Sequence, residues 1–581
     1  MLQNKVTRYL LFVLVFVMVL NVGLLLGSKV VTNKTTQQVA SVASSQEGDG
    51  SGERGEGEDP RLCRAFSDKA KNYTKYNEFG LGTELQPYEI WTPKQFVDIT
   101  NAGFDPYYYL QCSNISFSTT PQFTIPVFVG HYNGNYFTLQ EYKYIGDSAA
   151  FVGIFEKVQD GATIDHVRIA RSTLQLNGQN GAIAVLAGEL TNSKINDIKL
   201  YSSNVSAAYT SAAALVVQSY KSEATNIEIN GTTVRAKYNA SGMFNFVINS
   251  KLKNAKVVGG TVLAVSGHGA GIANIFDSNQ FLPVSGVFEN ISYKGTSVAG
   301  TQVAGVVNSL DNATLSYAEV EAPLSSVADT NNNSTIGGLV GEASNASIEK
   351  GHFNGTIDRK AFVNNVCGTT NYTGGVAGLL RNSSIYWSYA IGQIKVTDNC
   401  GGTGGVVGVS MDSTVQNSYA DIGFSISGSN GPLGGLAGTI LNSNNSLASF
   451  YKNRSTIRVI PLSGGTVTIL GGHIGLAVGS SFPSDMSYTS GSLPDVSAFN
   501  AGPYVGLYTD LDGNEFIPST IYYVDAYTCS GNCNTIGTAK PQAYLLNPVN
   551  LPTQTWEFSP TKWVQASLNS FPLIPSAKSN Y

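Results

Sequence analysis

A short glycine motif recurs at nearly regular intervals through more than half of the 581-residue chain. Its strongest copies read Gly337-Gly-Leu-Val-Gly341, Gly374-Gly-Val-Ala-Gly378, Gly404-Gly-Val-Val-Gly408, Gly434-Gly-Leu-Ala-Gly438 and Gly471-Gly-His-Ile-Gly475. Weaker copies, with Ala, Val or Asn in place of some glycines, extend the series back to residue 152, and the copies start roughly thirty residues apart. Such a period is typical of stacked units that bury their apolar face only against neighbouring units.

Each repeat unit continues from its small apolar run through a polar turn into a segment of alternating apolar and polar residues. Thr163–Ile169 and Ser193–Leu200 are examples. Alternation places two sets of side chains on opposite faces of a strand, while Gly and β-branched residues disfavour helices. The sequence therefore predicts an all-β fold, a right-handed parallel β-helix (solenoid) over residues 151–480. A β-propeller usually has a longer repeat, and a leucine-rich solenoid would need a Leu/Asn consensus that this chain lacks.

Both ends of such a solenoid need protection from edge-to-edge strand pairing. We therefore expect an N-terminal cap region at residues 61–150 and a C-terminal cap region at residues 481–581. Within the coils, the apolar residue between the motif glycines should point into the core, where it packs on its counterparts above and below. These residues are Leu339, Val376, Val406 and Leu436, whereas Asn417 is expected to face solvent.

Residues 9–27 form an almost unbroken apolar run that follows Lys5 and Arg8. A run of about twenty apolar residues can cross a bilayer as a helix, which predicts an uncleaved transmembrane signal-anchor after a short cytoplasmic N-terminus at residues 1–8. A cleaved signal peptide, which would give a secreted protein, is the alternative. Residues 28–60 are rich in Gly, Ser and Glu with few large apolar residues, and should form a disordered linker or stalk.

Two features predict a cell-membrane protein with its C-terminal bulk extracellular or lumenal. Asn-x-Ser/Thr sequons are frequent after the apolar run, where they are candidates for glycosylation. The candidates are Asn72, Asn114, Asn204, Asn230, Asn239, Asn290, Asn312, Asn332, Asn333, Asn345, Asn354, Asn371, Asn382, Asn444 and Asn453, and Asn33 is a further sequon in the stalk. The 6 cysteines, an even number, also all follow the apolar run.

All of these cysteines are candidates for disulfide bonds. They are Cys63, Cys112, Cys367, Cys400, Cys529 and Cys533. Cys367 and Cys400 precede successive glycine motifs and could bridge adjacent coils. Cys529 and Cys533 could close a small loop, which leaves Cys63 with Cys112, although six cysteines permit many other pairings. A zinc site at Cys529 and Cys533 is a weaker interpretation, because the remaining ligands are not visible in the sequence.

The glycine motif resembles the GLUG motif family, found in repeat regions of large surface proteins, including bacterial adhesins and immunoglobulin A peptidases. The resemblance extends to Pro87–Phe96, which looks like the family's opening strand followed by a short helix that starts at Thr92-Pro93. It continues through Phe128–Leu139 and ends in the Trp/Pro-rich stretch between Trp556 and Ile574. What the resemblance implies is a β-helical surface scaffold, because the family attaches these coils to varied activities.

Motifs for catalysis are scarce. The five histidines are His131, His166, His268, His352 and His473, and none lies in a His-Glu-x-x-His motif, which excludes a metalloprotease of that type. We predict no metal and no cofactor.

A polysaccharide lyase or glycosidase would need acidic residues, with an acidic or basic partner, on neighbouring coils. The nearest grouping is Asp165, His166, Arg168, Asp197 and Lys199. Its two halves become neighbours if Ile164 of one coil stacks on Ile195 of the next, but a solvated face of mixed charge is the favoured interpretation.

Aromatic residues offer a second functional clue. The chain has 30 tyrosines, and Trp387, Tyr389 and Tyr419 follow the repeat. Aromatic rings on a solvent-facing ladder could bind sugars or proteins, although burial in the core is favoured for residues of this type.

Composition excludes nucleic acid as a partner. The net charge is −5, only 13% of residues are charged, and no basic cluster is visible. We therefore predict a membrane-anchored, non-catalytic extracellular β-helix protein for adhesion or surface interaction. Its partners would be the membrane, through residues 9–27, and surface glycans or proteins. The alternatives are a carbohydrate-active enzyme on the same scaffold and a structural surface-coat component.

Overall fold

The computed structural model of the chain describes residues 63–64, 67–147, 150–278, 286–327, 334–360, 371–397, 401–427, 431–443, 449–461 and 469–479, with shorter segments between 484 and 565. The predicted cytoplasmic N-terminus, signal-anchor and stalk lie outside these residues and stay predictions. Among the described residues, no helix is both long and apolar enough to cross a membrane.

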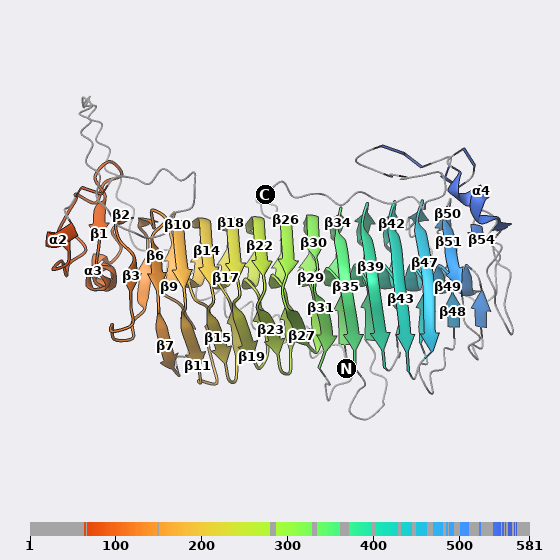
Figure 1. The fold of residues 1–581 in the computed structure, drawn as a ribbon, viewed down its shortest axis with the longest axis horizontal. Helices are drawn as coiled ribbons and strands as arrows, with labels where there is room; N and C mark the ends of the chain where they lie inside the picture. The colour runs from red at the N-terminus through yellow and green to blue at the C-terminus, as the bar shows by residue number, and fades with distance from the viewer. Residues whose placement is uncertain are drawn as a thin grey trace. The chain divides into compact units, whose positions relative to one another are not determined.

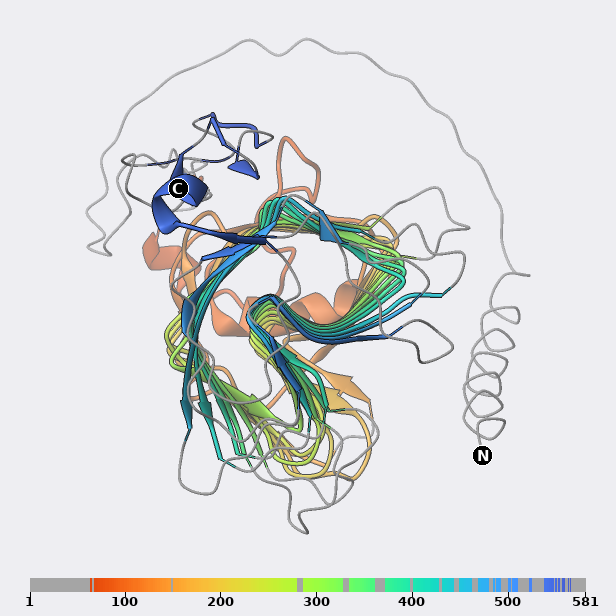
Figure 2. The same ribbon diagram turned by 90° about the vertical axis from the view of Figure 1, so that its right-hand side faces the viewer.

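Three parallel β-sheets wind together into a solenoid (Figure 1). Among the described residues, sheet A holds 30 strands, sheet B 13 and sheet C 12. One coil contributes β12 (Ala182–Ile183) to sheet C, β13 (Ala187–Thr191) to sheet B, and β14 (Lys194–Tyr201) and β15 (Asn204–Ala207) to sheet A. Figure 2 looks along the stack, where the strands of successive coils superimpose. The predicted all-β, right-handed parallel β-helix is confirmed.

Equivalent strands repeat with little change in length. Sheet B consists of β4 (Ile125–Phe128), β9 (Phe155–Gln159), β13, β17 (Val216–Tyr220), β21 (Phe244–Ile248), β25 (Ala273–Asp277), β29 (Val307–Asp311), β33 (Val340–Ser344), β37 (Ala377–Arg381), β41 (Val407–Met411), β45 (Ala437–Leu441), β49 (Ile474–Val478) and β53 (Val505–Thr509). The long strands of sheet A include β10 (Thr163–Ala170), β14, β18 (Glu223–Asn230), β22 (Lys251–Val258), β26 (Val287–Lys294), β30 (Thr314–Val320), β35 (His352–Arg359), β39 (Tyr389–Val396), β43 (Tyr419–Ile426) and β47 (Arg454–Pro461). Because the ladders are parallel and in register, each inward residue packs on its counterpart in the next coil.

The glycine motif forms the bend between sheet C and sheet B. Gly337 ends β32 (Ser334–Gly337), and Val340 begins β33. A β-carbon at Gly338 would clash with the carbonyl oxygen of Gly375 in the next coil, because backbone lies directly on backbone there. The apolar motif residues Leu339, Val376, Val406 and Leu436 are fully buried, as predicted.

Three of the weaker motif copies contain buried asparagines that lie in a row through the solenoid interior. Asn245, Asn274 and Asn308 occupy the place of the last motif glycine in consecutive coils. The Nδ2 of Asn274 donates to the Oδ1 of Asn245 at 2.9 Å, and the Nδ2 of Asn308 donates to the Oδ1 of Asn274 at 2.8 Å. Because a buried amide needs partners, this chain of hydrogen bonds lets asparagine replace glycine in the interior.

Serines satisfy backbone groups at the turns of the later coils. The backbone N–H of Ser383 donates to the Oγ of Ser413 at 3.0 Å, and that hydroxyl donates to the carbonyl of Met411 at 2.6 Å. The N–H of Ser388 likewise donates to the Oγ of Ser418 at 3.2 Å. The recurrent serines of the sequence therefore pair buried N–H groups between strands.

A short helix covers the N-terminal end of the solenoid, after α2 (Ser67–Ala70) and β1 (Tyr88–Ile90). α3 (Pro93–Asp98) starts after Thr92, whose side chain accepts from the N–H of Gln95, and η1 (Ile99–Ala102) follows. Phe96 of α3 is fully buried. A strand followed by a short helix was expected over Pro87–Phe96, and both are present. Since β1 pairs with β2 (Tyr108–Gln111), sheet A extends into the region predicted as a cap.

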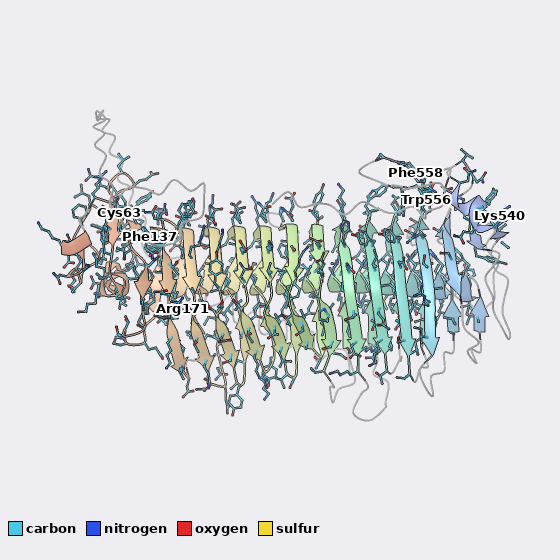
Figure 3. The ribbon with its side chains drawn as sticks, in the orientation of Figure 1. Cys63, Phe137, Arg171, Lys540, Trp556 and Phe558 are labelled. Carbon is cyan, nitrogen blue, oxygen red and sulfur yellow. A yellow bond between two sulfur atoms is a disulfide. The ribbon has the colours of Figure 1, made fainter. Side chains whose placement is uncertain are left out.

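The described C-terminal segments pack on the outer side of sheet A. β54 (Tyr522–Val524) and β55 (Thr538–Lys540) extend the sheet and lead to α4 (Gln542–Leu546). Trp556 and Trp563 are buried and their rings stack at 4.3 Å between centroids. In Figure 3, Trp556 and Phe558 lie beside the C-terminal coils.

Candidate functional site

One row of side chains runs in register along the outer face of sheet A, and we call it the outer row. From the N-terminal end it holds Arg168, Lys199, Glu228, Lys256, Ser292, Glu319, His352, Tyr389, Tyr419 and Arg454. The row is charged in its first half and largely aromatic in its second half. Both functional clues of the sequence therefore lie on the same face.

The charged half contains the grouping that suggested an enzyme. Ile164 does pair with Ile195, as the grouping required, and Arg168 is in register with Lys199. The Arg168 guanidinium instead turns to Asp197, with Nη1 3.1 Å from Oδ1 and Nη2 3.2 Å from Oδ2. The guanidinium of Arg168 and the carboxylate of Asp197 therefore form a bidentate ion pair. Arg168 is only 7% exposed, so its guanidinium is hardly accessible from solvent.

Asp165 is the most perturbed carboxyl of that grouping. Burial raises the pKa of Asp165, and hydrogen bonds with Thr163 and Asn196 partly oppose the shift. Its register partners are Asn133 and Asn196, so the adjacent coils place amides where a glycosidase needs a second carboxylate. The ring of His166 contacts the ring of Tyr136, with the two centroids 4.9 Å apart.

His131 is a neighbour that sequence reasoning did not connect with this grouping. Its Nδ1 lies 3.1 Å from the hydroxyl of Thr163, and its ring stacks on Tyr108 at 4.3 Å. Burial lowers the pKa of His131, and the charge of Asp165 opposes the shift. The histidine is therefore neutral near pH 7, and only the coil register could have revealed its position.

Several other charges on this face pair between coils. The ion pairs are Lys194–Glu223 (3.9 Å), Lys199–Glu228 (3.9 Å), Lys253–Glu289 (2.8 Å) and Lys294–Glu319 (3.3 Å). Exposed ion pairs of this kind contribute little to stability, but they prevent like charges from facing one another in adjacent strands. The pattern agrees with a solvated face of mixed charge.

The aromatic half of the outer row is covered from outside. His352 stacks on Tyr389 at 4.1 Å, and Tyr389 stacks on Tyr419 at 4.9 Å. Tyr419 is buried beneath Trp563, at 6.3 Å between centroids, while the following residue Ala420 faces the core. Tyr419 is therefore buried, whereas Trp387 and Tyr389 are half-buried. The expectation that these rings lie in the core of the coil is wrong, because they pack outside it, against Trp556 and Trp563 of the C-terminal segment.

A buried polar cluster near the C-terminal end resembles catalytic groups but is closed to solvent. His473, in the fifth motif copy, has its Nδ1 2.6 Å from the Oγ of Ser455, which also donates to Thr489. Its ring stacks on Tyr504 at 4.7 Å, and the side chain is 0% exposed. Burial lowers the pKa of His473 to about 3, so it is a neutral core residue out of reach of any substrate.

An open groove follows one corner of the solenoid, and we call it the asparagine groove. Asn312, Asn345, Asn382 and Asp412 line it from equivalent turn positions with φ near +50°. The groove has a volume of about 730 Å³, and the hydroxyls of Thr314, Ser347 and Ser384 complete its lining. The Nδ2 of Asn345 donates to the Oδ1 of Asn312 at 3.4 Å. Neutral amides and hydroxyls in successive coils are groups that bind sugar hydroxyls or peptide groups.

The three groove asparagines are also sequon residues, and so are two asparagines that the fold buries. Asn371 accepts from the N–H of Ser334 at 3.0 Å, and Asn453 donates to the carbonyl of Val415 at 2.7 Å. Both asparagines are at most 1% exposed, so the folded chain leaves no space for a glycan there. Asn332, Asn333 and Asn444 lie outside the described residues.

Cys63 and Cys112 form a disulfide, with Cα atoms 5.8 Å apart. It ties the segment before α2 to the end of β2, and Figure 3 labels Cys63 at the N-terminal end of the stack. Cys367, Cys400, Cys529 and Cys533 lie outside the described residues, so their pairing stays a prediction. The carboxylate of Glu89 lies beside the disulfide, but bonded cysteines offer no thiolate to a metal ion.

No family model and no curated protein matches this sequence. Among solved structures, a Bacteroides ovatus protein provisionally described as an immunoglobulin A1 protease aligns at 11% identity and a TM-score of 0.25, over 86% of this chain and 96% of that one. An IgA1 protease aligns at 10% and 0.23, over 79% of this chain and 26% of its own length. Tailspike protein 3 of bacteriophage CBA120 aligns at 12% and 0.22, over 80% and 65%. These values carry no functional argument.

Proposed function

We propose that the protein is a membrane-anchored surface protein whose β-helix lies outside the cytosol and binds glycans or proteins without catalysis. Residues 9–27 are the anchor, and the repeats are coils of the GLUG type. The observation that carries the proposal is the asparagine groove, a volume of about 730 Å³ lined by amides, hydroxyls and one carboxylate, that of Asp412. On the neighbouring face of sheet A, several charges pair between coils. Such a surface offers hydrogen bonds to a ligand but no activated acid or base.

The location rests on separate support. A disulfide between Cys63 and Cys112 suits an oxidising compartment, and sequons such as Asn114 and Asn204 lie on exposed positions. Protease protection in sealed membranes tests it. We expect the coils to resist protease added from the cytosolic side, and digestion of the coils from that side would contradict the proposal.

Binding is tested with the full-length chain on an array of glycans and surface proteins. The chain is produced without N-glycosylation, because Asn345 is also a sequon residue. We expect saturable binding to one ligand class, weakened by Asn345→Leu, which removes a groove amide. The matched control is Asn226→Leu, which has a similar positive φ but lies within β18 of sheet A, away from the groove. An array without any ligand, together with assembly of the chain into ordered particles, would favour the structural-coat alternative instead.

A further inference from the structure

A second corner of the solenoid exposes aromatic rings beside cations. It lies where β15, β19 (Thr233–Ala236) and β23 (Thr261–Ala264) of sheet A end. A pocket of about 490 Å³ occupies this corner, within the ~300–1,000 Å³ typical of small-ligand sites. Tyr209 lines the pocket and Tyr238 stands one coil further on, and the two are 47% and 48% exposed. Large rings exposed in adjacent coils indicate a contact surface.

Lys237 lies between these two rings. Its Nζ is 5.6 Å from the ring centroid of Tyr209 and 5.3 Å from that of Tyr238. Arg235 lines the same pocket and is exposed, and the lining contains no Asp or Glu. Within the described part of the chain, neither Arg235 nor Lys237 pairs with a carboxylate. The cation–π contacts of Lys237 are weak because they are exposed. Lys237 is therefore available to an anion, as Arg235 is.

The same pocket offers neutral hydrogen-bonding groups in a fixed order. Gln175, Ser206 and Arg235 are in register on the outer face of β11 (Thr173–Leu176), β15 and β19. Several other cations of sheet A pair with carboxylates of the next coil, as Lys199 does with Glu228 and Lys253 with Glu289. Two cations left without acids in a chain of net charge −5 therefore mark this corner as an anion site.

We propose that this pocket binds a carboxylated sugar residue of a glycan. The guanidinium of Arg235 and the ammonium of Lys237 hold the carboxylate, the ring of Tyr209 takes the C–H face of the sugar, and Gln175 and Ser206 bind its hydroxyls. The inference rests on the proposed binding function and narrows its ligand to acidic saccharides.

The test is titration of the full-length chain with an oligosaccharide that ends in a hexuronic acid, with its neutral hexose counterpart and with an acidic peptide. We expect saturable binding of the acidic sugar alone. The double variant Arg235→Gln/Lys237→Gln should weaken it about tenfold or more, the loss expected for charge-assisted hydrogen bonds. Tyr209→Ala should weaken it as well. Lys221→Gln is the matched control, because Lys221 also lies over a tyrosine, at 5.1 Å from the ring of Tyr220, but on another corner.

Equal affinity of the wild type and the double variant for the acidic sugar would overturn this site, and so would equal affinity for the neutral sugar. Binding of the peptide in place of the sugar would assign the corner to a protein partner and overturn the inference. No acidic sugar bound, while the array still yields another ligand, overturns the inference but leaves the proposed function intact. An array with no ligand removes the proposed function itself.

Discussion

Replacing Val406 with Asp should destabilise the middle of the solenoid. Val406 is 0% exposed, its N–H donates to the carbonyl of Leu436 at 2.8 Å, and its carbonyl accepts from the N–H of Val376 at 2.8 Å. Losing a buried valine costs about 1.5–3 kcal/mol. An unpartnered buried polar group adds about 1–3 kcal/mol, since the carboxyl is protonated in such a site rather than ionised. The free energy of unfolding should therefore fall by about 2.5–6 kcal/mol.

The matched control is Asn417→Asp, which introduces the same side chain at a half-buried turn position. Asn417 has a φ of 50°, a conformation that Asp tolerates, so we expect a loss of at most about 0.5 kcal/mol. Urea unfolding gives the two energies, and hydrogen exchange over residues 401–427 shows whether coils open locally, as solenoid repeats can. Equal unfolding midpoints and equal exchange for the two variants would mean that Val406 is not in a core, and the coil register would have to be abandoned.

Three further changes probe the stack, its interior and its N-terminal end. Gly375→Ala should lower the free energy of unfolding by several kcal/mol, because its β-carbon would clash with a backbone carbonyl of the next coil. Gly423→Ala is the control, since a β-carbon there meets no atom nearer than 3.9 Å and should leave thermal unfolding nearly unchanged. Folding depresses the pKa of His473 to about 3, so its stability contribution is complete above its unfolded pKa near 6.5 and falls as the pH drops toward 3, by about 1.4 kcal/mol per pH unit. The His473→Gln variant should lack that slope, and identical pH profiles would contradict the assignment. Reducing Cys63–Cys112, which are 49 residues apart, should lower stability by about 4 kcal/mol in the chain-entropy model, and peptide mapping that recovers both as free thiols would refute the bond.

The fold could be predicted from the sequence because its main constraint is local. A glycine is favoured where backbone lies on backbone, as at Gly338, and this requirement recurs in most of the coils. Within the motif, the flanking glycines leave one apolar side chain to fill the core, so Val406 and Leu436 could be placed there. Neither inference requires knowledge of a distant segment.

The interior polar rows could not be predicted in the same way. Asn274 in a motif position looks like a defect in the repeat, because its hydrogen bonds depend on Asn245 and Asn308 in other coils. The hydrogen bond of His473 could not be predicted either, since its partner Ser455 belongs to another part of the coil. The composition of a single repeat carries no sign of these contacts.

The contacts of the outer surface were predicted only in part, because a long exposed side chain can reach several neighbouring residues. Register placed Arg168 beside Lys199, but a long guanidinium reaches Asp197 and gains two hydrogen bonds. Tyr419 was correctly expected to be buried, although the cover comes from Trp563, which is remote in sequence. The exposed pair Tyr209 and Tyr238 had no signal beyond a similar position in successive repeats.

Whether the β-helix binds a surface ligand without changing it can be measured on the ligand itself. The full-length chain is incubated with its best array ligand at saturating concentration, and that ligand is analysed by size and mass over time. We predict saturable binding and recovery of the ligand unchanged. Shortened chains, new reducing ends or unsaturated sugars that accumulate with time, and disappear in an Asp165→Asn variant, would contradict the claim and identify a carbohydrate-active enzyme.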